Sequence, residues 1–215
     1  MLQRLVAGLF DLLSPPRCAA CGGLLDLRLA GFCDACAPLL EWAPAALTSA
    51  RDAAACVYGG PLRDALHALK YEAASELVPA LARLLARPAG SFAGRVDCVA
   101  VVPLHARKLR QRGYNQSALL ARPVARLLAV PFLPRLLVRT RDTGAQVGKN
   151  RSDRGAQLMG AMCASRRARA RTVLVIDDVR TSGATLAEAR RALYAAEARD
   201  VYTLVLAATP APEQT

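Results

Sequence analysis

Residues 173–185, VLVIDDVRTSGAT, constrain the fold of this chain more than any other segment. Apolar residues typical of a buried strand lead into two acids, Asp177 and Asp178, and then into a turn rich in hydroxyls that opens a helix. In a parallel sheet, ligands bind beyond the carboxyl ends of the strands, and a helix N-terminus offers free N–H groups and a positive dipole end. A capped strand–helix junction would explain one acid or one hydroxyl, but not two acids and three hydroxyls together. The segment therefore predicts an anion site at the edge of a parallel sheet.

The rest of the chain after about residue 50 shows the same alternation of strand and helix. Strands are expected to end at 57–58 and to cover 97–102, 172–176 and 201–207, and helices are expected at 62–70, 76–86, 115–128 and 185–198. Strands that alternate with helices indicate an α/β fold with a largely parallel sheet flanked by helices. Residues 43–55 are small and polar enough for a linker, so the domains are predicted as 1–50 and 51–215.

Four cysteines form two Cys-x2-Cys pairs separated by eleven residues. They are Cys18, Cys21, Cys33 and Cys36. Two such pairs suit a tetrahedral Zn²⁺, and four thiolates leave no position open for water, so the predicted zinc ribbon is structural. Redox pairs or disulfides are the alternatives, and they fit a reducing compartment less well. Residues 1–16 predict a short amphipathic helix that docks on the core, with a membrane-surface anchor as the alternative.

Charge points to an anionic partner. The chain has 29 Lys and Arg against 17 Asp and Glu, for a net charge of +12. The excess lies in two segments, 103–126 and 139–171, while hydrophobic residues at 53% are typical of a globular protein. No apolar run approaches the roughly 18 residues of a membrane span, so we expect no transmembrane segment and a cytoplasmic location.

Together these motifs resemble the ComF family of competence-associated proteins, in which a four-cysteine ribbon precedes a type I phosphoribosyltransferase-like domain. The resemblance rests on the two cysteine pairs, Lys70-Tyr71, VVPLHARKLRQRGYNQ at 101–116, the basic loop after Arg139 and IDDVRTSGAT, whose last part is similar to the signature for 5-phosphoribosyl 1-diphosphate (PRPP). These stretches extend over most of the chain.

The resemblance implies roles for particular residues. Asp177 and Asp178 would hold the ribose 2′- and 3′-hydroxyls at the catalytic centre. The implied phosphate-binding residues are Thr181, Ser182, Gly183, Ala184, Thr185, Pro103, Leu104, His105, Arg107, Arg112, Asn115, Arg139, Gln146 and Arg154. Residues 139–162 would form a loop that closes over PRPP with its Mg²⁺. The chain departs from the family at Ser182, Gln157 and Met162, where Thr, Asn and an aromatic residue are usual.

The implied function is PRPP or sugar-phosphate binding in a protein associated with natural transformation and DNA uptake. The implied activity is phosphoribosyl transfer, a pentosyl transfer, to an acceptor that the sequence does not identify. The alternative is a non-catalytic module that binds single-stranded DNA or a DNA-uptake helicase, in which the phosphoribosyl site is regulatory or vestigial.

Overall fold

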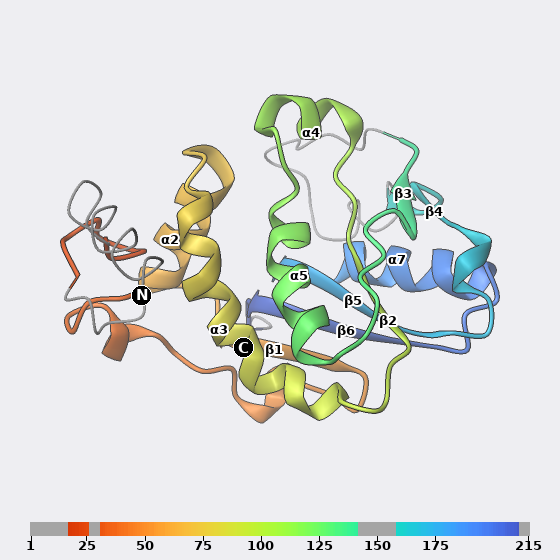
Figure 1. The fold of residues 1–215 in the computed structure, drawn as a ribbon, viewed down its shortest axis with the longest axis horizontal. Coiled ribbons are helices and arrows are strands. Elements are labelled where there is room, and N and C mark those ends of the chain that lie inside the picture. The colour runs from red at the N-terminus through yellow and green to blue at the C-terminus, as the bar shows by residue number, and fades with distance from the viewer. Residues whose placement is uncertain (1–16, 26–30, 142–157, 211–215) are drawn as a thin grey trace, which may run out of the picture.

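A four-stranded parallel sheet forms the centre of the molecule, in a computed structural model that describes residues 17–25, 31–141 and 158–210 (Figure 1). In spatial order its strands are β1 (Asp52–Val57), β6 (Asp200–Ala208), β5 (Thr172–Arg180) and β2 (Cys98–Val101). Val101, the last residue of β2, pairs with Ile176, so β5 continues beyond its neighbour. The predicted α/β fold with a parallel sheet flanked by helices is confirmed.

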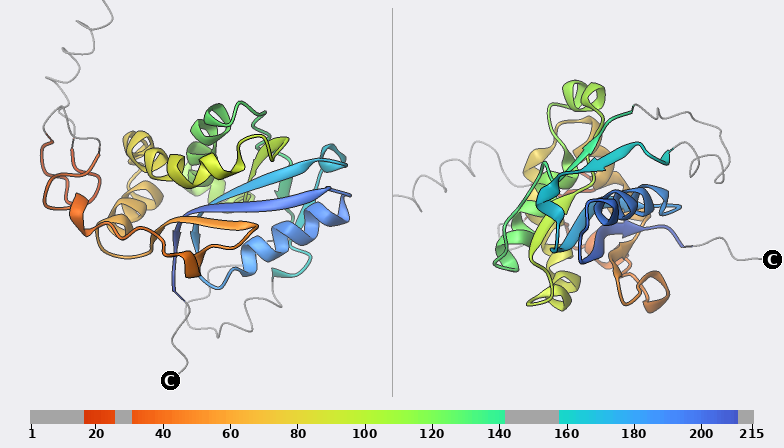
Figure 2. Two further views of the ribbon diagram at one scale, coloured as in Figure 1. Left: turned by 90° about the horizontal axis from the view of Figure 1, so that it is seen from below. Right: turned by 90° about the vertical axis from the view of Figure 1, so that its right-hand side faces the viewer.

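Helices cover both faces of this sheet (Figure 2). The helices are α2 (Gly60–Tyr71), α3 (Val78–Ala89), α4 (Ala106–Arg112), α5 (Gln116–Leu127) and α7 (Ala184–Ala195). Single 3-10 turns lie at Ala37–Leu39, Ala45–Leu47, Ser75–Leu77, Gly90–Phe92 and Arg166–Ala168. Successive side chains of a strand point to opposite faces, so Leu174 and Ile176 enter the core under α2, α3 and α5, while Val173 and Val175 enter the core under α7.

The segment expected to be a linker includes the first four residues of β1, and the chain before this strand folds back and pairs with it. The backbone N–H of Ala43 donates to the carbonyl of Ala55 at 3.0 Å, and Trp42 forms an antiparallel bridge with Cys56. Small residues such as those of 53–55 carry no strong strand signal, because neighbouring strands rather than their own side chains hold them in place.

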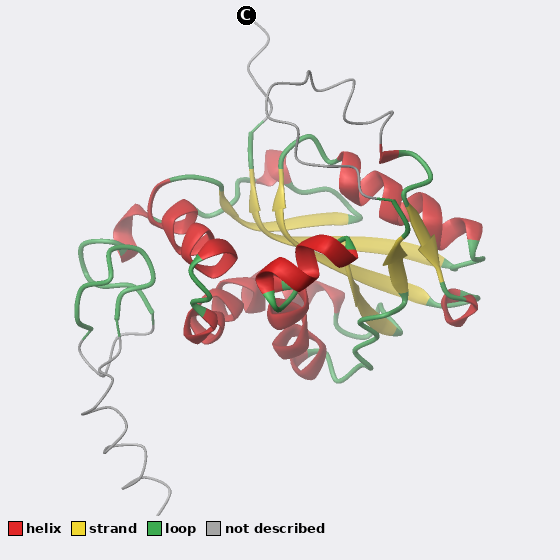
Figure 3. Cartoon of the chain, turned by 90° about the horizontal axis from the view of Figure 1, so that it is seen from above, coloured by secondary structure: helices red, strands yellow, loops and turns green. Residues whose placement is uncertain are grey.

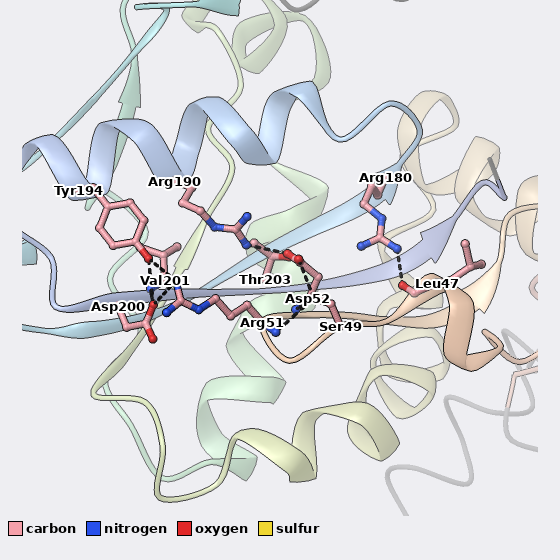
Figure 4. A network of polar contacts seen from close by, with 10 residues as sticks. All are labelled: Leu47, Ser49, Arg51, Asp52, Arg180, Arg190, Tyr194, Asp200, Val201 and Thr203. Atoms are coloured by element: carbon pink, nitrogen blue, oxygen red, sulfur yellow. Dashed lines mark hydrogen bonds and ion pairs between the residues drawn. The ribbon is translucent and has the colours of Figure 1, made fainter. Parts of the chain in front are cut away.

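A polar network fastens this edge of the sheet to α7 (Figure 4). The Asp52 carboxylate accepts from the Thr203 hydroxyl at 2.6 Å and from the Arg190 guanidinium at 2.7 Å. Arg180, at the end of β5, donates to the carbonyl of Leu47. These bonds join β1, β6, α7 and the segment before β1 into one unit.

The two segments that hold the four clustered cysteines, residues 17–25 and 31–36 (the cysteine-containing segments), lie at one end of the molecule (Figures 1 and 3). The antiparallel pair β3 (Leu137–Arg139) and β4 (Met162–Ala164) lies at the other. Phe32 is buried in the same core as the residues of α2 and α3. Gly31 has a φ of +98°, and a Cβ added there would lie 2.0 Å from the Cβ of Ala80 on α3. No helix in the described residues is long and apolar enough to cross a membrane.

Candidate functional site

The turn after β5 opens onto the carboxyl edge of the sheet. Gly183 caps α7 with a φ of +78°, and a Cβ added to it would meet no atom within 4 Å. Thr181 and Ser182 are exposed, and the Ser182 hydroxyl accepts from the backbone N–H of Ala184 at 3.4 Å. Because the first N–H groups of a helix have no partner within it, this turn offers backbone donors to an anion.

Asp178, near the end of β5, lies against a lysine from α2. The Nζ atom of Lys70 is 2.5 Å from Asp178 Oδ2, and the two side chains are 22% and 7% exposed. The ammonium group offsets the cost of burying a carboxylate. The structure therefore places a buried acid, paired with a lysine, near the open turn.

The neighbouring acid, Asp177, has different partners. Its Oδ1 atom accepts from the Ser117 hydroxyl and from the backbone N–H of Asp178, both at 2.9 Å. Burial raises the pKa of Asp177 well above its ordinary value, and the charge of Asp178 raises it further. Asp177 is therefore biased toward its protonated form.

The loop after β2 is held by side chains that the sequence assigned to phosphate. Asn115 Nδ2 donates to the carbonyl of Val102 at 2.9 Å, and its Oδ1 accepts from the backbone N–H of Ser117 at 3.0 Å. His105 caps α4, because its Nδ1 accepts from the N–H of Arg107 at 3.4 Å. Pro103 is buried, while Leu104 and His105 are partly exposed. These bonds give Asn115 and His105 positioning roles, and their contact with phosphate stays a prediction.

The carboxyl end of α2 meets the end of α4. The Arg112 guanidinium lies 5.3 Å from the centre of the Tyr71 ring and also donates to Gln116. Arg107 and Arg110 on the same short helix are exposed. Sequence reasoning assigned no role to Lys70 or Tyr71, although the pair Lys70-Tyr71 contributed to the family resemblance.

The remaining predicted residues belong to the basic loop and its flanks. Arg139 lies on β3 and is partly exposed, while Gln146, Arg154 and Gln157 lie outside the described residues. Met162 is fully buried on β4, and its backbone N–H donates to Glu188 on α7 at 3.0 Å. Its side chain therefore packs in the core.

The four paired cysteines converge as a possible metal centre. Their Sγ atoms all lie within 4.8 Å of one another, and those of Cys21 and Cys33 are 3.8 Å apart. Thiolates bound at about 2.3 Å to a tetrahedral zinc ion would lie about 3.8 Å apart. The cluster can therefore hold a metal ion.

The clustered thiols shift the pKa values of one another in opposite directions. Burial raises the pKa of Cys18, but N–H groups of Cys21 and Cys33 outweigh burial and bring the pKa to about 6. A hydrogen bond with Cys33 raises the pKa of Cys36 to about 12. Crowded sulfurs thus keep some protons that a divalent cation would displace.

The chain is similar in sequence to proteins named for DNA utilization and competence. It is 34% identical over 137 residues to DNA utilization protein YhgH of Escherichia coli K12, which is 61% of this chain and 60% of that protein. It is 33% identical over 100 residues to competence protein F of Haemophilus influenzae, which is 45% of this chain and 44% of that protein. The aligned regions thus span 60% or less of these relatives, and no family model matches.

Solved structures with partial likeness include two phosphoribosyl enzymes. Glutamine PRPP amidotransferase from B. subtilis is 20% identical with a TM-score of 0.41, over 60% of this chain and 26% of that chain. Adenine phosphoribosyltransferase from Thermoanaerobacter pseudethanolicus is 13% identical with a TM-score of 0.39, over 65% and 83% of the two chains.

Proposed function

We propose that this chain, which is similar in sequence to proteins named for competence and DNA utilization, belongs to the ComF family and binds PRPP or another ribose 5-phosphate compound at the carboxyl edge of β5. The observation that carries the proposal is the open turn at Gly183, five residues after Asp178, whose carboxylate contacts Lys70. A phosphate and a ribose diol need backbone N–H donors and carboxylate acceptors at adjacent positions, and this edge supplies both.

Each group of residues contacts a different part of the proposed ligand. The N–H groups and hydroxyls of Thr181–Thr185 bind the 5-phosphate, Asp178 accepts from one ribose hydroxyl, and Asp177 contacts the other in its more neutral form. Arg107, Arg112 and the Pro103–His105 loop would contact the diphosphate. The diphosphate would bring Mg²⁺, whose charge stabilises the leaving group. Phosphoribosyl transfer would break the C1′–O bond to the diphosphate, which leaves as pyrophosphate with the bonding electrons, while an electron pair of the acceptor forms a new bond to C1′. These residues would orient the sugar for that step and stabilise the developing charge.

We propose a cellular role in competence and DNA utilization, because the sequence relatives carry these names. A cytoplasmic location is part of this proposal and follows from the expectation drawn from the sequence. A second candidate function is a non-catalytic module that binds single-stranded DNA or a DNA-uptake helicase. The observation that favours it is α4, which exposes Arg107 and Arg110 and contains no acid. The metal proposed for the four cysteines is a structural zinc ion, because four thiolates suit zinc and leave no open position.

Calorimetric titration of the full chain with PRPP and Mg²⁺ tests the sugar-phosphate site. Asp178→Asn removes a charged acceptor, whose hydrogen bonds contribute about 1.5–3 kcal/mol, so it should weaken PRPP binding at least about tenfold. Asp64→Asn is the matched control, because Asp64 is half exposed beside Arg63 on α2 and should leave binding unchanged.

Equal affinity of Asp178→Asn and the unaltered chain for PRPP would refute the site. The second candidate predicts a different pattern with a single-stranded oligonucleotide as titrant. Its binding should be the same in Asp178→Asn and should fall steeply as salt is raised, because phosphate contacts release counterions.

A further inference from the structure

We propose that residues 2–13, near the amino end of the chain, bind as an amphipathic helix in an apolar groove between α3 and α5. These residues lie outside the described part of the chain, so the inference rests on the groove, on the place where the described chain begins and on the sequence of the segment. It does not depend on the proposed sugar-phosphate site.

The groove lies at the surface between α3 and α5, which pack side by side on one face of the sheet (Figure 1). Residues of α3 within 78–86 line one side, residues of α5 within 123–127 line the other, and the volume of the groove is about 330 Å³. Of the described residues that line it, all but Arg83 are apolar. Val124 is buried, whereas 56% of Leu127 is exposed. Grooves of this kind bind the apolar face of an amphipathic helix.

The described chain begins close to the amino end of this groove. The backbone N–H of Ala19 donates to the carbonyl of Gly31 at 2.7 Å, and Gly31 lies against Ala80 on α3. Ala80 belongs to the turn of α3 whose residues 78, 79 and 82 line the groove. Arg17 precedes Ala19 by two residues, and the chain from residue 13 to residue 17 can extend over about 12 Å. The segment before Arg17 can therefore reach the groove.

The sequence of the segment matches this surface. Its apolar residues recur at the spacing that places them on one face of a helix. They are Leu2, Leu5, Val6, Leu9, Leu12 and Leu13. Arg4 and Asp11 would lie on the opposite side of such a helix, in water. Pro15 and Pro16 follow the apolar stretch, and proline cannot continue a helix, so the helix would end before the cysteine-containing segments.

The lengths of the two surfaces also agree, and the connection fixes their relative direction. Residues 2–13 would extend over about 17 Å as a helix, and residues 78–86 of α3 extend over about 12 Å. Residue 13 is the end of the segment nearest to the start of α3, so the segment would run antiparallel to α3. Leu5, about 12 Å further along the segment, would then lie near Ala86 and Leu127.

Hydrogen exchange of the full chain, measured by mass spectrometry, tests the docking. A helix as short as this one, with Gly8 in its interior, is marginal in water, so a synthetic peptide of residues 1–16 should exchange its amide hydrogens rapidly. Burial of the apolar face in the groove would stabilise the helix in the full chain. We expect the amides of residues 6–13 to exchange at least about tenfold more slowly there than in the peptide.

Leu127→Asp tests the groove itself. It places a carboxylate where the apolar face of the segment would lie, and an unpaired charge is costly to bury, so residues 6–13 should exchange as rapidly as in the peptide. Leu39→Asp is the matched control, because Leu39 is 63% exposed in a 3-10 turn outside the groove and should leave their exchange slow. Slow exchange of β5 in both variants would show that the sheet is intact.

A photoreactive benzoylphenylalanine in place of Leu5 tests the position and direction of the segment. It should form cross-links within one chain to residues near Ala86 or Leu127. The proposal is overturned if residues 6–13 exchange as rapidly in the unaltered chain as in the peptide, if Leu127→Asp leaves their exchange slow, or if the cross-links join two copies of the chain. Flotation of the unaltered chain with vesicles of neutral phosphatidylcholine would also overturn it, because the apolar face would then bind a membrane surface.

Discussion

At the residue scale, two adjacent carboxyl groups at the end of β5 have different electrostatic surroundings. Asp178 has the ammonium group of Lys70 at 2.5 Å, whereas Asp177 accepts from the Ser117 hydroxyl and a backbone N–H and lies next to the carboxyl group of Asp178. A cation stabilises the charged form of an acid, and burial without a cation stabilises the neutral form. The two neighbouring acids therefore differ in their partners, and burial raises the pKa of Asp177 well above its ordinary value.

Replacing Asp177 tests this difference through stability. A carboxyl whose pKa is raised on folding contributes stability below its unfolded pKa of about 3.8, and this contribution is lost as the pH rises through the folded value. Asp177→Asn keeps an oxygen that accepts from Ser117 and has no proton to lose. We expect the free energy of unfolding of the unaltered chain to fall relative to Asp177→Asn as the pH rises above 4, by up to about 1.4 kcal/mol per pH unit within the window.

Urea unfolding at several pH values measures this effect. Asp64→Asn serves as the control, since Asp64 is exposed on α2 and lies beside Arg63. Parallel pH profiles for the unaltered chain and Asp177→Asn would show that Asp177 is charged in the folded protein.

At the scale of elements, apolar patterning predicts most of the sheet and its helices. The run at 172–176 forms the start of β5, and the helix expected at 185–198 forms as Ala184–Ala195. The same patterning stops short of Asp177 and Asp178, which lie inside β5 because neighbouring strand β6 continues alongside them. Local patterns carry no information about such pairing, and for the same reason α4, β3 and β4 were not predicted.

The site itself could be predicted only in part. The turn that is proposed to bind phosphate is one contiguous motif, which a sequence displays directly. The contacts of Lys70 with Asp178 and of Ser117 with Asp177 join residues far apart in the chain, and nothing in the local sequence of either member indicates its partner. Glu188 lies on α7 among other charged residues, so the sequence suggests that its side chain is exposed. In the structure only 4% of Glu188 is exposed, and the local sequence does not indicate this burial.

Glu188 links α7 to β4, and its replacement should loosen that link. Its carboxylate accepts from the Met162 N–H at 3.0 Å and from Arg191 at 2.7 and 2.9 Å. The bonds with Arg191 lower the pKa of Glu188 although burial opposes them, so its stabilising effect is present above pH 4.5 and is lost as the pH falls. Glu188→Gln loses the charge-assisted bonds and should cost about 1–3 kcal/mol at neutral pH, measured by urea unfolding.

Glu197→Gln provides the comparison on the segment after the same helix. Glu197 pairs with Arg169 at 2.9 Å, but both side chains are largely exposed. Exposed ion pairs contribute at most about 1 kcal/mol, so this change should cost less than Glu188→Gln. If the two substitutions lowered the free energy of unfolding equally, the buried position of Glu188 would add nothing to the strength of its ion pair.

At the scale of the whole molecule, the cysteine-containing segments and the sheet share one core. Cys18 and Phe32 are buried with residues of α2 and α3, and the close approach of Gly31 to Ala80 leaves no room for a side chain between them. A segment this short buries too little apolar surface to fold alone. Loss of the proposed zinc ion should therefore affect more than the segment that holds it.

Metal removal tests this coupling. We expect about one zinc per chain by elemental analysis. A strong chelator should then lower the Tm of a single cooperative transition, because the energy of metal binding is also folding energy for the shared core. Cys21→Ser with Cys36→Ser should abolish zinc binding and reproduce the lowered Tm. Cys163→Ser should change neither, because Cys163 is exposed on β4, outside the cluster. A Tm that is unchanged by chelation, or two separate transitions, would show that the two parts fold independently.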